Sequence, residues 1–321
     1  MYRKIEEYLK NYFNSKEEKI LVIDGARQVG KTYIIEKIGK EYYRNFISIN
    51  LDADKKGDRV FEDVKTCDDF YIQLSALYGN KLNIRDDTLV FIDEISIYPQ
   101  FFSLLKQLRI DNKYRYICSG SLLGIELLKT GLTPMGSIIR KEMYPMDFEE
   151  FLIANNFGPD AINYVRRSYE NRTSLNESLH NTLLNLFLTY LYVGGLPDAV
   201  KSYVEEKNVF KIKEIQKDIY DFYSDDAAKY DLENRLKIKR IYEMMISSID
   251  NKVKRIKYSD INDNKKDCFA NYVEEFDYII NSGIALACNA VSEPKFPLAQ
   301  SSVKNLIKLY MNDVGLLSYL L

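Results

Sequence analysis

Residues 25–32, with the sequence GARQVGKT, fit the pattern G-x-x-x-x-G-K-[ST] at every fixed position. Glycines at this spacing let a loop curl so that successive backbone N–H groups point at phosphate oxygens, and the following helix adds its positive end. In such loops the lysine reaches the β- and γ-phosphates and the hydroxyl residue binds Mg²⁺. The pattern therefore predicts a nucleotide-phosphate site in which Lys31 contacts phosphate and Thr32 holds Mg²⁺.

The predicted nucleotide-binding residues are the loop and the start of the helix that follows it. They are Gly25, Ala26, Arg27, Gln28, Val29, Gly30, Lys31, Thr32 and Tyr33. For Arg27 two interpretations stand: a phosphate contact, or a solvent-exposed loop arginine, which we favour.

A second candidate element is the run 89–94 (LVFIDE), four apolar residues followed by two carboxylates. A buried strand that ends in aspartate at the carboxyl edge of a sheet delivers that side chain next to a bound metal ion. Asp93 is predicted to orient Mg²⁺ or its waters, and Glu94 to polarise an attacking water as general base. The competing interpretation is a strand that ends in a solvated acidic turn.

Small polar residues end another apolar run, at Ser119 and Ser121. Their hydroxyls are candidates for a hydrogen bond to the γ-phosphate or to the attacking water. A helix N-cap is an equally good interpretation, and it does not exclude the first.

The elements that must position these residues alternate between strand and helix. Short apolar runs predict buried strands at 19–24, 46–51, 88–93 and 115–119, and helical periodicity follows at 32–40, 68–77, after Pro99 and at 121–128. This alternation predicts an α/β fold with a parallel sheet of the P-loop type.

The pattern changes near Pro145, after which helical periodicity dominates as far as Asn251. A sharp break stands at 194–197 (GGLP). After Arg255 come a helix at 269–282 and a strand-like run at 284–291, which suggest a small winged-helix unit with a terminal strand pair. We therefore expect a P-loop core at 1–145, a helical lid at 146–250 and a winged-helix-like domain at 251–321.

Composition excludes several classes of protein. Lys plus Arg (45) nearly balance Asp plus Glu (47). This near-zero net charge excludes a protein that binds nucleic acid through bulk positive charge alone. A single histidine excludes multi-histidine metal sites, and four scattered cysteines without a CxxC pair argue against zinc. The opening residues lack a secretory signal and no apolar run reaches the length of a membrane span, so we expect a cytoplasmic protein without a membrane partner.

The ordered set GARQVGKT, LVFIDE and ICSGS resembles a family of predicted AAA+-type ATPases of bacteria and archaea that carry a C-terminal domain of unknown function. The likeness continues through YPMDFEEF (144–151), VGGLPD (193–198) and KLYMNDVGLL (308–317). The resemblance implies ATP and Mg²⁺ as cofactors, and a serine-ended strand between the P-loop strand and the strand that ends in Asp93. It also implies a winged helix followed by a nuclease-like part, and we expect the latter to be absent from this sequence.

We therefore expect an ATPase that couples Mg-dependent hydrolysis to movement of the helical and winged-helix domains. The alternative is a slow nucleotide-gated switch or scaffold that binds DNA or a protein. Many relatives carry arginine directly after the glycine at position 136, but here Ser137 stands there and the nearest basic residues are Arg140 and Lys141. The alternative is an arginine supplied by a neighbouring subunit, which would require a homo-oligomer.

One basic segment, 229–266, has eleven Lys/Arg against six Asp/Glu. It is a candidate for phosphate contacts on DNA. The alternative, which we favour slightly, is a solvated helix face whose counter-charges lie on other elements.

Overall fold

The computed structural model describes residues 1–121, 124, 136–230, 235–250, 256, 258–262 and 268–321. It divides the chain into two compact units: an N-terminal unit, Arg3–Tyr144, and a C-terminal unit, Pro145–Leu321 together with Met1–Tyr2. Each unit is taken by itself below.

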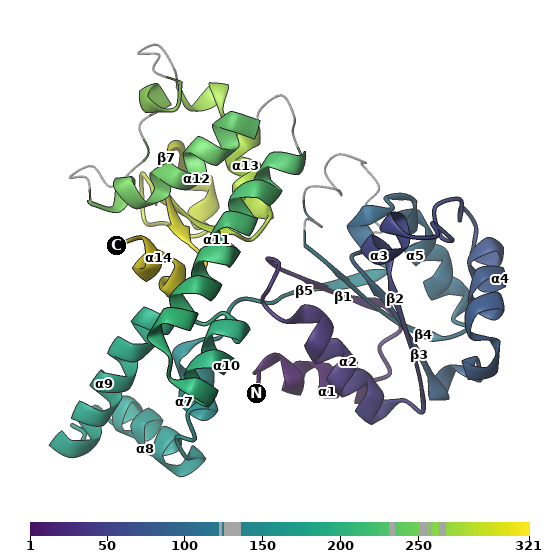
Figure 1. Cartoon of the computed structure of the whole chain (residues 1–321), viewed down its shortest axis with the longest axis horizontal. Helices are drawn as coiled ribbons and strands as arrows, with labels where there is room; N and C mark the ends of the chain where they lie inside the picture. Colours follow the sequence, from purple (N-terminus) through teal and green to yellow (C-terminus); the bar gives the residue numbers. More distant parts are fainter. Residues whose placement is uncertain (122–123, 125–135, 231–234, 251–255, 257, 263–267) are drawn as a thin grey trace. The chain divides into compact units, whose positions relative to one another are not determined.

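The N-terminal unit is built on a parallel sheet of five strands in the order β2-β3-β4-β1-β5, with helices packed around it (Figure 1). The strands are β1 Ile20–Asp24, β2 Asn45–Asn50, β3 Thr88–Asp93, β4 Arg115–Gly120 and β5 Ile138–Glu142. The helices are α1 Ile5–Asn14, α2 Lys31–Tyr42, α3 Leu51–Lys56, α4 Cys67–Tyr78 and α5 Gln100–Asp111.

The centre of this sheet follows directly from the apolar runs. Every residue of β1 and β3 is buried, as expected for parallel strands that are covered on both faces. The serine-ended strand β4 pairs with both of them, so the predicted α/β fold and the strand order implied by the family resemblance are confirmed. All five carboxyl ends meet at one edge of the sheet, which brings the polar residues after β1, β2, β3 and β4 together.

Strand β5 and helix α3 are elements of this unit that the sequence patterns did not predict. Strand β5 has the sequence IIRKE and is half-buried to exposed, because it lies at the edge of the sheet beside β1. Helix α3 begins in the charged stretch after β2, where the Asn50 side chain accepts a hydrogen bond from the N–H of Ala53 at 2.8 Å and caps the helix. Most of the helix predicted at 121–128 lies outside the described residues.

Where the structure describes it, the C-terminal unit is mainly helical and carries a two-stranded antiparallel hairpin near its end. Its helices are α7 Phe148–Ala154, α8 Pro159–Glu170, α9 Glu177–Val193, α10 Pro197–Glu206, α11 Val209–Tyr230, α12 Arg235–Asp250, α13 Val273–Asn281 and α14 Val314–Leu320. The hairpin joins β6 Ala285–Val291 to β7 Ser302–Met311. The helix predicted at 269–282 is shorter than expected, because Tyr272 is buried with a non-helical φ of -135° that separates a 3₁₀ turn from α13.

Three segments that carry the family resemblance come together inside this unit. The Asp313 carboxylate accepts hydrogen bonds from the N–H groups of Gly195 (2.6 Å) and Gly315 (2.9 Å), while Met146 N–H donates to the Gly195 carbonyl at 2.7 Å. A Cβ on Gly195 would stand 2.0 Å from the Met146 carbonyl oxygen, so only glycine fits there. The turn at 194–195 is thus fixed by two segments more than a hundred residues apart.

Two residues of the basic segment use their side chains within the unit. Lys237 pairs with the buried carboxylate of Glu275 at 3.2 Å, and Arg240 donates to the Ile261 carbonyl at 2.7 Å.

Among the residues that the structure describes, no helix is both long and apolar enough to cross a bilayer.

Candidate nucleotide-binding site

The GARQVGKT loop connects β1 to α2 at the carboxyl edge of the sheet, and two of its glycines adopt backbone angles that other residues avoid. Gly30 caps α2 with a φ of +93°, and Gly25 has a φ of +146°. A Cβ on Gly25 would stand 2.1 Å from the carbonyl oxygen of Met143. The loop is therefore shaped by its own glycines and by a close approach to the chain that follows β5.

Lys31 folds back over the loop. Its ammonium group donates hydrogen bonds to the carbonyl oxygens of Gly25 and Ala26, both at 2.8 Å, and the side chain is almost fully buried. Burial lowers the pKa of Lys31 from its ordinary value, and the nearby carboxylates of Glu94, Asp24 and Asp93 oppose that shift. A phosphate group would give this buried cation a stronger acceptor than two neutral carbonyls do.

The carboxylate of Asp93 is where the two sequence motifs meet. It is only 2% exposed, and the hydroxyl of Thr32 donates to its Oδ2 at 2.9 Å. The buried hydroxyl of Ser119, at the end of β4, donates to Oδ1. The Asn50 amide, at the end of β2, approaches Oδ2 at 3.4 Å. Two neighbouring strands and one helix thus place polar groups around the carboxylate at the end of β3.

Glu94 follows directly and lies in the left-handed region with a φ of +53°. This conformation is uncommon for a residue with a side chain and is often found at functional sites. The hydroxyl of Ser121 donates to Glu94 Oε2 at 3.0 Å. The two predicted serines therefore have different partners, Ser119 on Asp93 and Ser121 on Glu94.

These groups fit Mg²⁺ held jointly by protein and nucleotide. Such a site uses one or two carboxylates, a hydroxyl, phosphate oxygens and several waters. Thr32 and Asp93 supply the protein's share within hydrogen-bond distance of each other. In the part of the chain that the structure describes, no group of three or more His, Cys, Asp or Glu side chains could hold a metal by itself.

An ion pair beside the loop, between a buried carboxylate and a partly exposed guanidinium, was not predicted from the sequence. Asp24 is the last residue of β1, its Oδ1 accepts the N–H of Gly25 at 2.8 Å, and its other oxygen pairs with the guanidinium of Arg140 on β5. Burial raises the pKa of Asp24 above its ordinary value, and Arg140 opposes that shift. Arg140 is one of the two basic residues nearest to position 137, where many relatives carry an arginine. Here its guanidinium is paired with Asp24 of its own unit.

The other predicted residues have various environments. Val29 and Ala26 are buried, Arg27 is half-buried, Gln28 is exposed with a φ of +66°, and Tyr33 is 62% exposed on α2.

Sequence reasoning gave Asp24 and Asn50 no role in the site, and it named Arg140 only as a basic residue near position 137. Asp24 carried a usable signal, since it is the polar residue that ends the strand predicted at 19–24, just as Asp93 ends the strand predicted at 88–93. The strand predicted at 46–51 ended one residue beyond Asn50.

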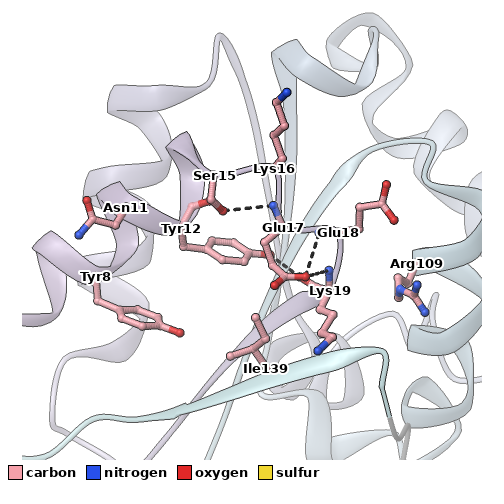
Figure 2. Close-up of a pocket in the computed structure, with 10 residues that line it drawn as sticks. All are labelled: Tyr8, Asn11, Tyr12, Ser15, Lys16, Glu17, Glu18, Lys19, Arg109 and Ile139. Atoms are coloured by element: carbon pink, nitrogen blue, oxygen red, sulfur yellow. Dashed lines mark hydrogen bonds between the residues drawn. The ribbon is translucent and has the colours of Figure 1, made fainter.

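A separate hollow lies at the opposite edge of the sheet (Figure 2). It is lined by Tyr8 and Asn11 of α1, by the connection to β1 and by Arg109. Within it the Glu17 carboxylate accepts the N–H of Lys19 at 3.0 Å. Lys19 precedes the first residue of β1 whereas the P-loop follows the last, so this hollow is not part of the phosphate site.

Comparisons with known proteins agree with this geometry. Residues 17–152 match the family model of the AAA domain, and residues 184–321 match that of a domain of unknown function. Residues 17–152, which include the P-loop and all five strands of the parallel sheet, are thus similar to an AAA domain. A comparison with curated proteins finds no match.

Solved structures are similar to this chain over a longer stretch than either family model. The Walker-type ATPase PABY2304 of Pyrococcus abyssi is similar over 99% of this chain and 95% of its own, with 14% identity and a TM-score of 0.58. At that identity the likeness shows the fold alone. The ORC1 protein of Aeropyrum pernix in complex with DNA (12% identity, 97% and 87% covered, TM-score 0.35) and PCH-2 of C. elegans (12% identity, 65% and 65% covered, TM-score 0.39) are too distant to support a further argument.

Proposed function

We propose that this AAA-type P-loop domain binds Mg-ATP and hydrolyses its γ-phosphate bond with Glu94 as the general base. The observation that carries the proposal is the convergence of Thr32 and Ser119 on Asp93, one residue before Glu94, with Lys31 buried in the adjoining loop. A solvated acidic turn would not bury its carboxylate and surround it with hydroxyl groups. This arrangement supports a site built around a cation and an anion.

Each residue has a role that follows from its position. Lys31 would exchange the carbonyls of Gly25 and Ala26 for phosphate oxygens. Thr32 and Asp93 would hold Mg²⁺, which supplies neutralisation of the phosphate charge that develops during transfer. Glu94 would accept a proton from the attacking water, and the hydroxyl of Ser121 would fix the orientation of its carboxylate.

Coupling to the rest of the chain is part of the proposal. We infer that 146–250 acts as a helical lid and that 251–321 forms a winged-helix-like domain, on the basis of the helix order and the β6–β7 hairpin. Hydrolysis would then change the position of these parts.

Replacement of the P-loop lysine tests the proposal. Lys31→Ala should abolish binding of ATP and ADP, measured by isothermal titration calorimetry with Mg²⁺ present. Lys40→Ala, on the exposed face of the same helix α2, is the matched control and should bind as the wild type does. Nucleotide affinity that survives Lys31→Ala would refute the phosphate site.

The alternative function, a slow nucleotide-gated switch, is favoured by one observation. Arg140 is bound to Asp24 and so is already committed to a structural pair. A protein without a ready arginine at the γ-phosphate would bind nucleotide and turn over slowly. Steady-state ATPase rates, measured with and without duplex DNA and at several protein concentrations, separate the two functions, because an arginine supplied by a second copy makes the specific rate rise with concentration.

DNA binding by the basic segment 229–266 needs its own test. Lys237 and Arg240 already have partners inside the C-terminal unit, which reduces the charge available for phosphates. A gel shift with duplex DNA at low salt decides the matter, and no shift at about 50 mM salt would remove DNA from the list of partners.

A further inference from the structure

Arg3, at the start of the chain, lies against the P-loop. Its side chain is buried, and Nη1 donates a hydrogen bond to the carbonyl oxygen of Val29 at 2.8 Å. The second arm of the same guanidinium, Nη2, donates to the carbonyl oxygen of Tyr144 at 2.6 Å. One rigid, planar group therefore connects the loop to Tyr144, the last residue of the N-terminal unit.

The position of Arg3 is itself fixed. Its backbone N–H donates to Glu6 Oε1 at 3.1 Å, and the Glu6 carboxylate is paired with Lys37 of α2 at 2.9 Å. Because Lys37 belongs to the helix that starts in the P-loop, the Glu6 carboxylate connects the backbone of Arg3 to α2. The contact with Val29 is thus part of a braced structure.

The bond to Val29 decides which way one P-loop amide points. In a trans peptide the C=O and the following N–H point in opposite directions. When Arg3 holds the Val29 carbonyl on one side of the loop, the N–H of Gly30 is directed to the other. Gly30 immediately precedes Lys31, and amides at this point of such a loop cradle the phosphates. Arg3 thereby orients a donor that it does not touch.

The segment at Met143–Tyr144 is tied to the other end of the loop as well. Met143 N–H donates to the Asp24 carbonyl at 2.7 Å, and the Met143 carbonyl lies so close to Gly25 that a Cβ there would clash. Both ends of the P-loop, Gly25 directly and Val29 through Arg3, are therefore fixed to the two residues after which the chain enters the C-terminal unit at Pro145.

We propose that Arg3 is a positioning residue that sets the Val29–Gly30 peptide for phosphate binding and transmits the nucleotide state of the P-loop to the Met143–Tyr144 exit segment. The inference rests on the proposed binding of Mg-ATP at this loop. Nucleotide that draws Gly30 N–H toward a phosphate pulls on the Val29 carbonyl and, through the guanidinium, on Tyr144. Linkage is reciprocal. If nucleotide binding shifts the position of the Tyr144 carbonyl, a change that shifts Tyr144 in the same way alters nucleotide affinity by the same coupling free energy.

Hydrogen exchange of the full chain, followed by mass spectrometry, tests the proposal with two variants. Arg3→Met removes both hydrogen bonds while keeping an apolar stem, and Arg3→Lys keeps the charge on a compact group that cannot form the two-armed fork. Arg44→Gln, an exposed arginine just before β2 at the opposite edge of the sheet, is the matched control. Thermal melting establishes that each variant is folded.

Without nucleotide, peptides covering 25–32 and 141–146 should exchange about tenfold faster in Arg3→Met than in the wild type, since charge-assisted hydrogen bonds are lost from both. Arg3→Lys should lie between the two, and Arg44→Gln should match the wild type. Equal exchange in both segments for Arg3→Met and wild type would overturn the proposal.

With saturating Mg-ATP, protection in the wild type should extend from 25–32 to 141–146. In Arg3→Met the loop should still become protected while the change at 141–146 disappears, which a merely structural role would not produce. Protection of 141–146 that is the same in both proteins contradicts the inference. If the wild type binds no ATP, the proposed function fails by itself, and the nucleotide-free comparison still decides the role of Arg3.

Discussion

The hydroxyl of Thr32 donates a hydrogen bond to the Asp93 carboxylate at 2.9 Å, which joins two motifs that stand 61 residues apart in the chain. The contact exists because parallel strands bring their carboxyl ends to one edge, and β4 inserts between β1 and β3 with Ser119 at the same level. Both groups are oxygen donors of the kind that Mg²⁺ prefers. We therefore expect changes at Thr32 or Asp93 to alter the Mg²⁺ dependence of nucleotide binding.

Removal of the Thr32 hydroxyl should reveal this metal dependence. Thr32→Val keeps the shape of the side chain, so affinity for ATP in EDTA should stay near that of the wild type. In Mg²⁺ the variant should bind at least about tenfold more weakly than the wild type, as expected for the loss of one contact to a charged group. Titration calorimetry with Mg²⁺ or EDTA measures the difference, with the exposed Thr182→Val as control. Equal Mg²⁺ enhancement in the variant and the wild type would exclude Thr32 as a metal ligand.

Glu94 should separate binding from hydrolysis. In Glu94→Gln we expect ATP affinity within about threefold of the wild type and a turnover lower by about 10²–10⁴-fold, the contribution typical of a general base. Ser121→Ala should lose less, because it only orients the carboxylate. Phosphate release assays give the rates, and Asp63→Asn, an exposed carboxylate of the same unit, controls for the change of charge. Unchanged turnover in Glu94→Gln would exclude it as the base.

The pair of Asp24 and Arg140 should matter more for folding than for chemistry. Arg140→Gln leaves a buried carboxylate without its partner. Because the Arg140 side chain is 35% exposed to water, the loss in the free energy of unfolding should be about 1–2 kcal/mol, less than for a fully buried pair. Asp24→Asn combined with Arg140→Gln should recover a large part of that loss, because no charge is left buried. Urea unfolding of the two single variants and the double variant forms a double-mutant cycle. Additive losses would mean that the two side chains do not interact.

The core of the N-terminal unit could be predicted because burial on both faces requires continuous apolar runs. Strand β3 begins and ends where the run TLVFID does, and Asp93 follows from being its last residue. Strand β5 escaped prediction because an edge strand tolerates charges, and three of the five residues in IIRKE are charged. The strands could therefore be predicted from the sequence where they are buried on both faces, but not at the exposed edge of the sheet.

Only part of the candidate site could be predicted from the sequence, for a related reason. Motif spacing identifies groups that act on phosphate directly, such as Lys31 and Glu94. It says nothing of the groups that hold them, because those contacts depend on the folded sheet. Arg3 reaches Val29 across 26 residues and Tyr144 across 141, and no periodicity links such positions. Asp24 precedes a glycine loop in sequence, but its need for Arg140 follows only from the pairing of β1 with β5.

The Asp313 carboxylate should give the C-terminal unit a distinctive pH dependence. Burial raises its pKa to about 6, although the N–H groups of Gly195, Leu316 and Gly315 partly offset that shift. An unfolded aspartate has a pKa of about 3.9. Between these two values the folded protein holds a proton that the unfolded chain has released, so the contribution of Asp313 to stability falls as pH rises.

The expected size of this effect is about two pKa units, or roughly 3 kcal/mol of unfolding free energy between pH 4 and pH 7. Asp313→Asn cannot titrate, so the stability of the wild type relative to this variant should decrease by that amount over the range. Chemical denaturation followed at several pH values, with a probe in the C-terminal unit, measures the difference. Asp198→Asn, an exposed carboxylate on α10, provides the matched control and should show no such trend. A wild type that gains stability over Asp313→Asn as pH rises would mean that the three N–H donors outweigh burial, and that the carboxylate, not the acid, is the form the fold prefers.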